Sequence, residues 1–258
     1  MDDPNIHLFA VTHKKLDNTI EKTIENNGRL IIGVRECKCY PYSDSIGSDN
    51  ISYKNKYYSE LSALYWIWKQ KYNGIIGLEH YHRFFLNDSK QILSKQEAIE
   101  LIKSNDVILS KPIHLHTSIK FCYFRYHHIS DYNKLCKILI QQSTNQRKLK
   151  KIIRSFSRSK SFSPCNLMIC SSKFLDDYCS WLFPALFELE KKINLGKHTG
   201  YQERVFGYLS ERFINVFVKY NDCKVVYCET SGVDKEKSHI LSSFFYNIKA
   251  MFKKEIGK

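Results

Sequence analysis

Apolar residues recur along the chain in two patterns: short continuous runs, and longer stretches in which they return every three or four residues. A short run favours a strand buried on both faces, and the longer spacing favours a helix with one buried face. The predicted strands are residues 6–11, 30–34, 75–78, 106–109, 166–170 and 224–228. The predicted helices are residues 17–26, 52–72, 94–104, 132–142, 146–155, 174–192 and 202–218. Alternating strands and helices predict an α/β fold.

The stretch 49–85 carries the densest group of candidate functional residues. Its predicted helix ends at Asn73 and Gly74, and a short apolar strand follows. Directly after that strand come five polar or ionisable residues, Glu79, His80, Tyr81, His82 and Arg83. Ligands of open α/β sheets bind outside the carboxyl ends of the strands, so the last four of these residues are candidates for ligand binding.

Polar residues also stand at two other places that favour a bound anion. One segment follows the first strand, the usual place for a nucleotide in a doubly wound sheet, and consists of Thr12, His13 and Lys14. The other opens the helix near residue 52, where backbone N–H groups are free, and consists of Asn50, Ser52, Lys54 and Asn55. Ordinary capping of the helix is the alternative interpretation of the second segment.

Composition excludes several classes of protein. The chain has 258 residues, of which 43% are hydrophobic and 14% aromatic, so it can bury a real core. Its nine cysteines form no CxxC pair, and neither a signal peptide nor an apolar run of membrane-spanning length is found. The motifs of P-loop enzymes and of serine hydrolases are absent as well. We therefore expect a globular protein of the reducing cytoplasm.

Positive charge is concentrated in the second half. The net charge is +14, and residues 132–175 contain ten Lys and Arg but no Asp or Glu. Such a block attracts polyanions, although a solvated basic surface explains it equally well.

The pattern of the tail, residues 238–258, predicts a basic amphipathic helix. It predicts contact with an anionic membrane surface, and packing on the rest of the chain is the alternative.

Several long motifs resemble a bacterial family of capsular and exopolysaccharide synthesis. They are DNISYKN, YYSELSALYWIWKQ, IIGLEHYHRFF, NLMIC, YCSWLFPALFELE and RVFGYLSERFINVFV, and they extend to about Tyr227. The family pattern reads roughly GDNISxKNxxYxELTxxYWxWKN, followed by GLxHYRRYF. The chain departs from it at His82, where the family usually has Arg, and at Glu79, where a small residue or Cys is common.

The resemblance implies a glycosyltransferase of surface polysaccharide assembly, and some members are linked to galactofuranose transfer. It implies a single-domain GT-A-like fold, a mixed, mostly parallel sheet flanked by helices. Residues 1–232 would form this domain, which has a nucleotide-sugar half (1–125) and an acceptor half (126–232). Residues 233–258 would form a basic amphipathic tail. The basic, aromatic segment 111–128 reads as a long functional loop. We assign acceptor binding to His127, His128 and Asn166.

The residue chemistry is compatible with such a transferase. Many of these enzymes hold the donor diphosphate through a metal on an Asp-x-Asp after a central strand, and no such motif follows residues 75–78. We expect metal-independent transfer with Arg83, His80 and Lys54 facing the diphosphate, without excluding Mn²⁺ or Mg²⁺. The His-x-His pairs at residues 80–82 and 114–116 lack further ligands, so we predict no metal site.

An inverting transferase also needs a carboxylate that deprotonates the acceptor hydroxyl. The candidates are Glu60, Glu203 and Glu211, and the sequence does not separate them.

Taken together, the sequence and the resemblance predict a cytoplasmic transferase at the inner face of the membrane. It would use a nucleotide-sugar donor, UDP-linked, and a lipid-linked or glycan acceptor. The alternative is a non-catalytic nucleic-acid-binding protein, favoured by the charge and aromatic content; we expect no nucleic-acid partner because no RNA-binding signature is present.

Overall fold

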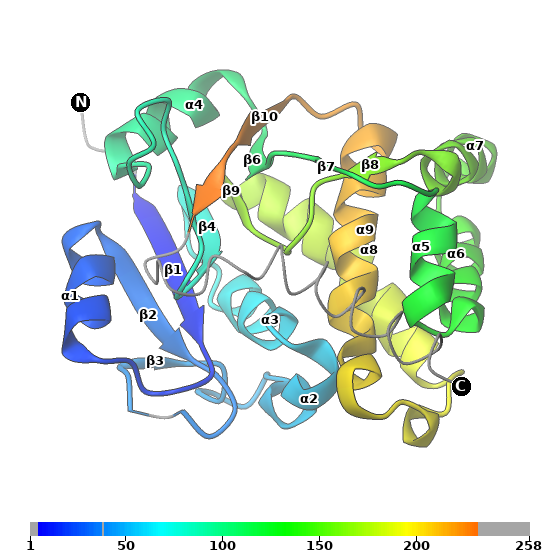
Figure 1. The fold of residues 1–258 in the computed structure, drawn as a ribbon, viewed down its shortest axis with the longest axis horizontal. Coiled ribbons are helices and arrows are strands. Elements are labelled where there is room, and N and C mark those ends of the chain that lie inside the picture. Colours follow the sequence, from blue (N-terminus) through cyan, green and yellow to red (C-terminus); the bar gives the residue numbers. More distant parts are fainter. Residues whose placement is uncertain (1–4, 38, 232–258) are drawn as a thin grey trace, which may run out of the picture.

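A seven-stranded sheet forms the centre of the computed structural model, which describes residues 5–37 and 39–231 (Figure 1). The strand order is β10-β6-β9-β4-β1-β2-β3. Only β9 runs antiparallel to its neighbours; the other strands of this sheet are parallel. The strands are β1 (Ile6–Thr12), β2 (Arg29–Gly33), β3 (Tyr42–Ser43), β4 (Ile75–His80), β6 (Val107–Ser110), β9 (Met168–Ser171) and β10 (Val225–Cys228). The predicted mixed, mostly parallel α/β sheet is confirmed.

Helices cover both faces of this sheet (Figure 1). They are α1 (Asn18–Asn26), α2 (Asn55–Tyr58), α3 (Leu61–Lys69), α4 (Lys95–Ser104), α5 (Ile119–Tyr126), α6 (Ile129–Gln142), α7 (Gln146–Arg158), α8 (Ser172–Glu190) and α9 (Val205–Tyr220). The 3₁₀ turns are η1 (Ser52–Lys54), η2 (Leu195–Lys197) and η3 (Gly200–Arg204). Two small antiparallel pairs join β5 (Phe84–Phe85) to β11 (Thr230–Ser231) and β7 (Ile113–His114) to β8 (Ser161–Phe162).

The alternation of side chains along β1 divides the core. Phe9 and Val11 point to the large cluster formed with α3, α8 and α9, while Leu8 and Ala10 point to the smaller clusters under α4 and α1. Successive residues of a strand face opposite sides of the sheet, so a strand buried on both faces must be apolar at every position. This is why the short apolar runs located the central strands correctly.

The connections reverse direction between β1 and β4. From β1 the chain passes through α1 to β2 and β3 on one side, and it then returns to β4 on the other side of β1. The two strands are parallel neighbours, and Val11 lies opposite His80 at their carboxyl ends. A topological switch point of this kind opens a crevice in which α/β proteins bind their ligands.

Two sequence-based predictions of secondary structure were wrong. The helix expected over residues 52–72 is divided into η1, α2 and α3, because Ser59 adopts a positive φ of 52°. Gly207 of α9 packs directly against Ser59, and a Cβ there would lie 3.3 Å from that side chain. The segment 111–128 is not a loop, since it contains β7 and α5, and the Ser118 side chain caps α5 by accepting from the Phe121 N–H.

Both predicted halves contribute strands to the same sheet: β1, β2, β3, β4 and β6 come from residues 1–125, and β9 and β10 come from residues 126–232. Their assignment to donor and acceptor stays a prediction. The tail, residues 233–258, lies outside the described residues. Among the helices that are described, none combines the length and the apolar character needed to cross a membrane.

Candidate functional site

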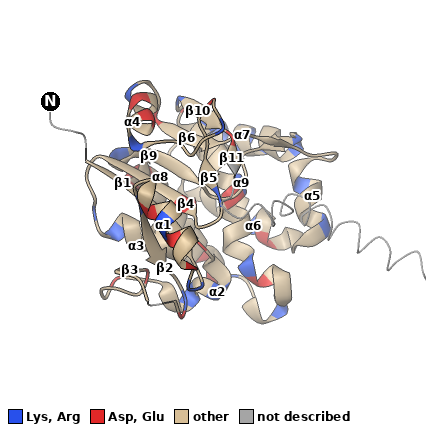
Figure 2. Ribbon diagram, turned by 60° about the vertical axis from the view of Figure 1, so that its left-hand side comes forward, with Lys and Arg blue, Asp and Glu red and all other residues tan. Residues whose placement is uncertain are grey.

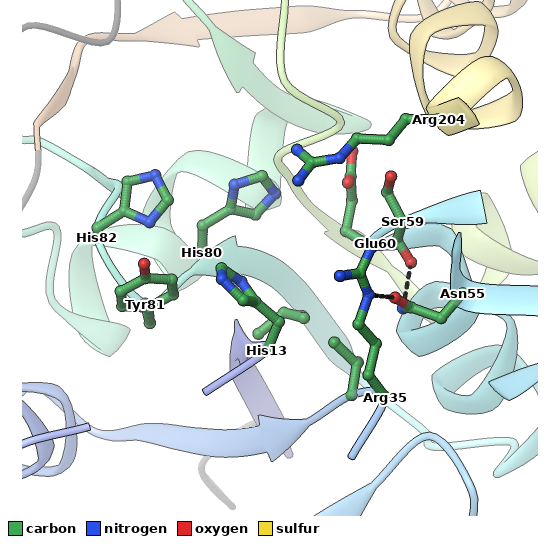
Figure 3. A pocket seen from close by; sticks show the side chains of 11 residues that line it. His13, Arg35, Asn55, Ser59, Glu60, His80, Tyr81, His82 and Arg204 are labelled. Carbon is green, nitrogen blue, oxygen red and sulfur yellow. Dashed lines mark hydrogen bonds between the residues drawn. The ribbon is translucent and has the colours of Figure 1, made fainter. Parts of the chain in front are cut away.

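A small cavity lies at the switch point. It has a volume of about 100 Å³ and is bordered by the carboxyl ends of β1, β2 and β4 together with the start of α3 (Figure 3). The residues that line it are Val11, His13, Val34, Arg35, Asn55, Ser59, Glu60, His80, Tyr81, His82 and Arg204. Five of the predicted donor-binding residues are therefore brought together here: His13, Asn55, His80, Tyr81 and His82.

Two arginines supply fixed positive charge to this first cavity. Arg35 directly follows β2, and its Nε donates a hydrogen bond of 2.7 Å to Asn55 Oδ1. Arg204 ends η3, and its guanidinium points toward Glu60 and His80 (Figure 3). Within the described chain, neither guanidinium is within ion-pair distance of a carboxylate. Both are therefore available to an anionic ligand.

Two histidines of the first cavity, His13 and His80, have lowered pKa values, which favour the uncharged ring. Burial lowers the pKa of His80 well below its ordinary value, and the charge of Arg83 lowers it further. The pKa of His13 is lowered by burial and by Arg35. The buried His80 Nε2 has no hydrogen-bond partner among the described residues. His80 therefore offers an uncharged hydrogen-bonding group to a ligand.

A second, larger cavity of about 380 Å³ lies on the same edge of the sheet, beyond the carboxyl end of β6. Polar residues occupy one part of it, including Arg83, Glu211 and Arg212, while aromatic rings form a wall. Its lining residues are Arg83, Ser110, Lys111, Pro112, Ile113, Phe162, Pro164, Cys165, Tyr201, Tyr208, Glu211, Arg212, Glu229 and Thr230. This volume falls within the range of small-molecule sites.

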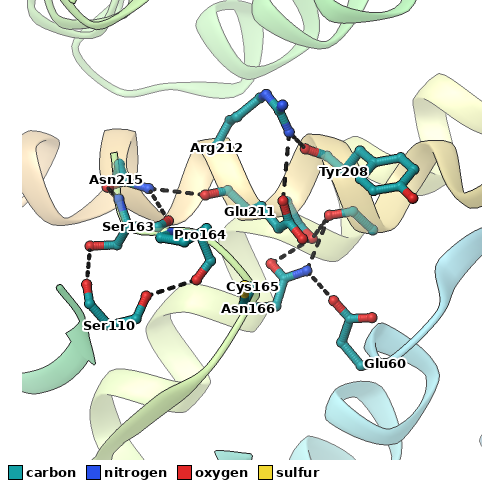
Figure 4. A network of polar contacts seen from close by, with 12 residues as sticks. Glu60, Ser110, Ser163, Pro164, Cys165, Asn166, Tyr208, Glu211, Arg212 and Asn215 are labelled. Atoms are coloured by element: carbon teal, nitrogen blue, oxygen red, sulfur yellow. Dashed lines mark hydrogen bonds and ion pairs between the residues drawn. The ribbon is translucent and has the colours of Figure 1, made fainter. Parts of the chain in front are cut away.

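Asn166 connects the borders of the two cavities (Figure 4). Its Nδ2 donates to Glu60 Oε1 at 2.5 Å and to the Gly207 carbonyl at 3.1 Å, and its Oδ1 accepts from Ser210 Oγ at 2.8 Å. The preceding residue, Cys165, accepts a hydrogen bond at its Sγ from Arg83. The segment 165–166 therefore fixes one carboxylate and one guanidinium where the cavities adjoin.

Two carboxylates in this region have raised pKa values. Burial raises the pKa of Glu211 to about 7; Arg212 opposes that shift and the negative charge of Glu60 adds to it. Burial also raises the pKa of Glu60, against the hydrogen bond from Asn166 and the charges of Arg204 and Arg83. A carboxylate that titrates near neutral pH in a cavity is suited to general acid–base catalysis.

Strained backbone accompanies the site. Among the described residues with a positive φ that are not glycine, three line the cavities, Arg35 (60°), Ser59 (52°) and Cys165 (81°), and a fourth, Asn166 (50°), follows Cys165 directly. Such conformations cost of order 1–3 kcal/mol each and persist where the surrounding structure imposes them, often at functional sites. Here they aim the Arg35 and Asn166 side chains at the first cavity and at Glu60.

Other predicted donor residues do not line either cavity. Lys54 forms an ion pair of 2.7 Å with Glu190, so it does not face the site. The Ser52 N–H and hydroxyl both donate to Asn50 Oδ1 in the turn before α2, and neither side chain caps η1 or α2, so the capping alternative is not observed. Thr12 is buried and donates its hydroxyl to the Lys14 carbonyl. The Lys14 ammonium stands 5.3 Å from the ring of Tyr81, at the rim of the first cavity.

Glu79 was expected at the mouth of β4, and the structure buries it completely instead. Its carboxylate forms an ion pair of 2.8 Å with the equally buried Arg29 and accepts from the Phe85 N–H. Glu203 pairs with Lys56 and lines neither cavity. Of the three candidate bases, the structure therefore brings Glu60 and Glu211 to the cavities and leaves Glu203 outside.

The predicted acceptor-binding histidines lie behind the second cavity. His127 is buried against the cavity-lining rings of Tyr201 and Tyr208, with centroid separations of 6.0 and 4.5 Å. Burial lowers its pKa to about 3. The ring of His128 packs against that of His198, which is hydrogen-bonded to Asp131 at 2.7 Å. Neither predicted histidine lines the second cavity.

The residues that sequence reasoning missed are Arg35, Ser59, Cys165, Tyr201, Arg204, Tyr208 and Arg212. Arg35 had a usable signal, because it follows a predicted strand in the same way as His13 and His80 do. Tyr201, Tyr208 and Arg212 belong to η3 and α9, and nothing in their spacing distinguishes cavity from core. For a metal, the described residues offer no cluster of three or more His, Cys, Asp or Glu side chains.

Two of three comparisons with known proteins found a match. No curated protein matches it. The apo structure of WbbM, a bifunctional glycosyltransferase, is similar with a TM-score of 0.75 and 22% sequence identity. The match covers 89% of this chain and 45% of that one, so the chain spans less than half the length of WbbM. This likeness confirms the predicted transferase-like fold. A family model described as a domain of unknown function, DUF4422, matches residues 7–222, and the chain therefore belongs to the DUF4422 family.

Proposed function

We propose that the protein is a glycosyltransferase that moves a sugar from a nucleotide donor, UDP-linked, to a lipid-linked or glycan acceptor. One observation carries the proposal: a cavity with two arginines that form no ion pair with a described carboxylate, at the switch point of the sheet, adjoins a larger cavity that contains a carboxylate with a pKa of about 7. The fold shared with a solved glycosyltransferase supports it.

The first cavity would receive the donor diphosphate. Guanidinium groups bind phosphate oxygens through paired, charge-assisted hydrogen bonds, and Arg35 and Arg204 have no competing carboxylate among the described residues. The uncharged His80 Nε2, which is buried without a partner there, would add one hydrogen bond. Arg83 stands on the far side of the border, where its charge reaches both Glu60 and Glu211.

The second cavity would receive the acceptor. Tyr201, which is 53% exposed and whose ring packs against that of Tyr208 with centroids 4.7 Å apart, offers the amphipathic surface on which a sugar ring packs. In the proposed step, Glu211 removes the proton of the acceptor hydroxyl and the oxygen forms a bond to the anomeric carbon. The bond from that carbon to the diphosphate breaks, and the nucleoside diphosphate leaves with the electron pair. Glu60, held by Asn166, would orient the sugar at the border.

Fixed cations would take the place of a metal in this scheme. The developing charge on the leaving diphosphate needs positive groups already in position, and preorganised arginines supply this stabilisation without metal. Arg35, Arg83 and Arg204 are the residues assigned to this role. A metal requirement is directly measurable, because transfer by these residues alone survives chelation by EDTA.

The proposal also covers the pathway, the sugar and the location of the protein. The motif resemblance supports a role in capsule, O-antigen or exopolysaccharide synthesis, with galactose or galactofuranose as the sugar. Lipid-linked acceptors lie at the inner face of the cell membrane, so we place the protein in the cytoplasm, peripheral to that face. The basic tail, residues 238–258, would contribute to membrane contact.

A donor-hydrolysis and transfer assay tests the activity. The full chain is incubated with UDP-, GDP- and CMP-sugars and with simple glycosides or lipid-linked sugars, and the released nucleotide is measured with and without EDTA. The expected result is nucleotide release from a UDP-sugar that increases with acceptor and persists with EDTA. Release that disappears in EDTA would overturn the metal-independent scheme, and no release from any donor would overturn the transferase.

A further inference from the structure

A groove separate from both cavities runs between α5, α6 and α7. Its volume is about 570 Å³, and its floor is formed by apolar side chains of α6 and α7 that include Ile129, Cys136, Ile140 and Ile153. Neither Glu60 nor Glu211 contacts it. The proposed transfer reaction gives this groove no role.

Two phenylalanines stand exposed at the rim of this groove. Phe121 is 47% exposed and Phe124 is 56% exposed, on the same side of α5, with ring centroids 6.0 Å apart. Large apolar side chains that face solvent together usually mark a surface that contacts a partner. Their positions, three residues apart on a helix, place both rings beside the apolar floor.

The same rim is strongly basic. Lys150, Arg154 and Arg158 follow one another at four-residue intervals along α7 and border the groove, and Lys120 borders it from α5. All four side chains are exposed, and none forms a hydrogen bond or ion pair with another described residue. The helices α5, α6 and α7 together contain ten Lys and Arg against one carboxylate, Asp131, which is buried against His198. Figure 2 shows blue Lys and Arg segments on α5 and near α7.

We propose that this groove and its rim are a docking surface for an anionic phospholipid bilayer. Phe121 and Phe124 enter between the lipid headgroups, the apolar floor receives hydrocarbon, and the cations on α5 and α7 bind lipid phosphates. A bilayer surface presents the matching chemistry, a layer of negative charge above hydrocarbon. The inference concerns α5–α7 only and does not depend on transferase activity.

The shape of the groove favours lipid over nucleic acid. A single strand binds on aromatic platforms beside cations, and its bases stack on ring faces. Here the floor between the cations is mainly aliphatic, and its one aromatic residue, Tyr132, is buried. Among the residues that line the groove, exposed rings are therefore found only at the rim, in Phe121 and Phe124. Hydrocarbon is the better occupant of such a floor, because its binding removes the apolar surfaces of both the lipid chain and the groove from water.

Vesicle flotation of the full chain tests the proposal. Vesicles of phosphatidylcholine alone are compared with vesicles that contain phosphatidylglycerol as well, at low and high salt. The variants are F121S/F124S, which removes the apolar contact, and K150E/R154E, which reverses two charges. The matched control is K22E/K103E, which makes the same charge change on α1 and α4, at the other end of the molecule (Figure 1). Circular dichroism and gel filtration verify that each variant is folded.

The wild-type chain should float only with anionic vesicles, and less at high salt. Each cation near an anionic surface contributes about 1 kcal/mol, so K150E/R154E should lower the partition coefficient at least about thirtyfold. F121S/F124S should lower it tenfold or more, and K22E/K103E should lower it less than threefold. Equal binding by wild type and groove variants, or equal loss in the control, would overturn the proposal. So would wild-type binding to single-stranded RNA in place of anionic vesicles.

Discussion

Asn166 Nδ2 donates a hydrogen bond of 2.5 Å to Glu60 Oε1, although the two residues are 106 positions apart in the sequence. The contact joins the start of α3 to the turn before β9, across the border of the two cavities. It fixes the Glu60 carboxylate, whereas the carboxylate of Glu211 has, among the described side chains, only the more distant Arg212 guanidinium at 3.7 Å. In the proposed mechanism, this asymmetry favours a positioning role for Glu60 and proton transfer by Glu211.

Replacement of Glu211 tests that assignment. The variant E211Q keeps the size of the side chain and removes the base, so kcat should fall by about 10²- to 10⁴-fold while donor binding changes less than twofold. The matched control is E203Q, whose side chain lines neither cavity; its kcat should stay within twofold of wild type. Wild-type kcat in E211Q, together with a large loss in E60Q, would reverse the two roles.

The pH dependence of activity should report the same group. The pKa of Glu211 is raised to about 7, and a general base acts only when it is deprotonated. The value of kcat/KM should therefore rise with pH and level off above about pH 7, and E211Q should lose this dependence. A profile that is already flat between pH 5 and 8 in the wild type would contradict the assignment.

Stability should show the opposite trend with pH. Glu211 holds its proton more tightly in the folded chain, where its pKa is about 7, than in the unfolded chain, where it is near 4.5. Its contribution to stability is therefore complete below about pH 4.5 and is lost as the pH rises through 7. The melting temperature of wild type minus that of E211Q should fall between pH 5 and pH 8; a constant difference would show that the carboxyl does not titrate in this range.

Substitutions of Arg204, Arg35 and Lys54 should distinguish cations that line the first cavity from a cation outside it. Arg204 and Arg35 line the first cavity, so R204A and R35A should each weaken UDP binding about tenfold or more, because a charge-assisted contact to phosphate is lost. Lys54 is paired with Glu190 outside the cavity, and K54M should change the dissociation constant less than twofold. Isothermal titration calorimetry with UDP measures all three. Equal losses in all three variants would indicate diffuse attraction instead of a defined site.

The buried pair of Arg29 and Glu79 should support the fold only. Both side chains are fully buried, and removing one partner leaves an uncompensated charge, so E79A should lower the free energy of unfolding by about 3–5 kcal/mol in urea titrations. The double variant R29M/E79L removes both charges and should recover most of this loss. A double variant as unstable as E79A would show that the pair itself is needed.

The sequence predicted the fold better than the site, for a physical reason. A strand buried on both faces needs an unbroken apolar run, as in residues 75–78, so the central strands were visible in the sequence. The cavity residues Tyr201 and Tyr208 have no comparable pattern, because a ring that faces a cavity and a ring that faces the core occupy similar helical positions. The break at Ser59 depends on the approach of Gly207, 148 positions away, and no local signal marks it.

The most direct test of the account is a thermal-shift panel of UDP, GDP, CMP and their sugars, with and without EDTA, on wild type and R83A. A ligand at about a hundred times its dissociation constant stabilises the fold by roughly 2.7 kcal/mol, a rise of about 5–10 °C in melting temperature for a chain of this size. The account predicts such a rise with a UDP-sugar, unchanged by EDTA and reduced in R83A. No rise with any nucleotide, or a rise that EDTA removes, would contradict it.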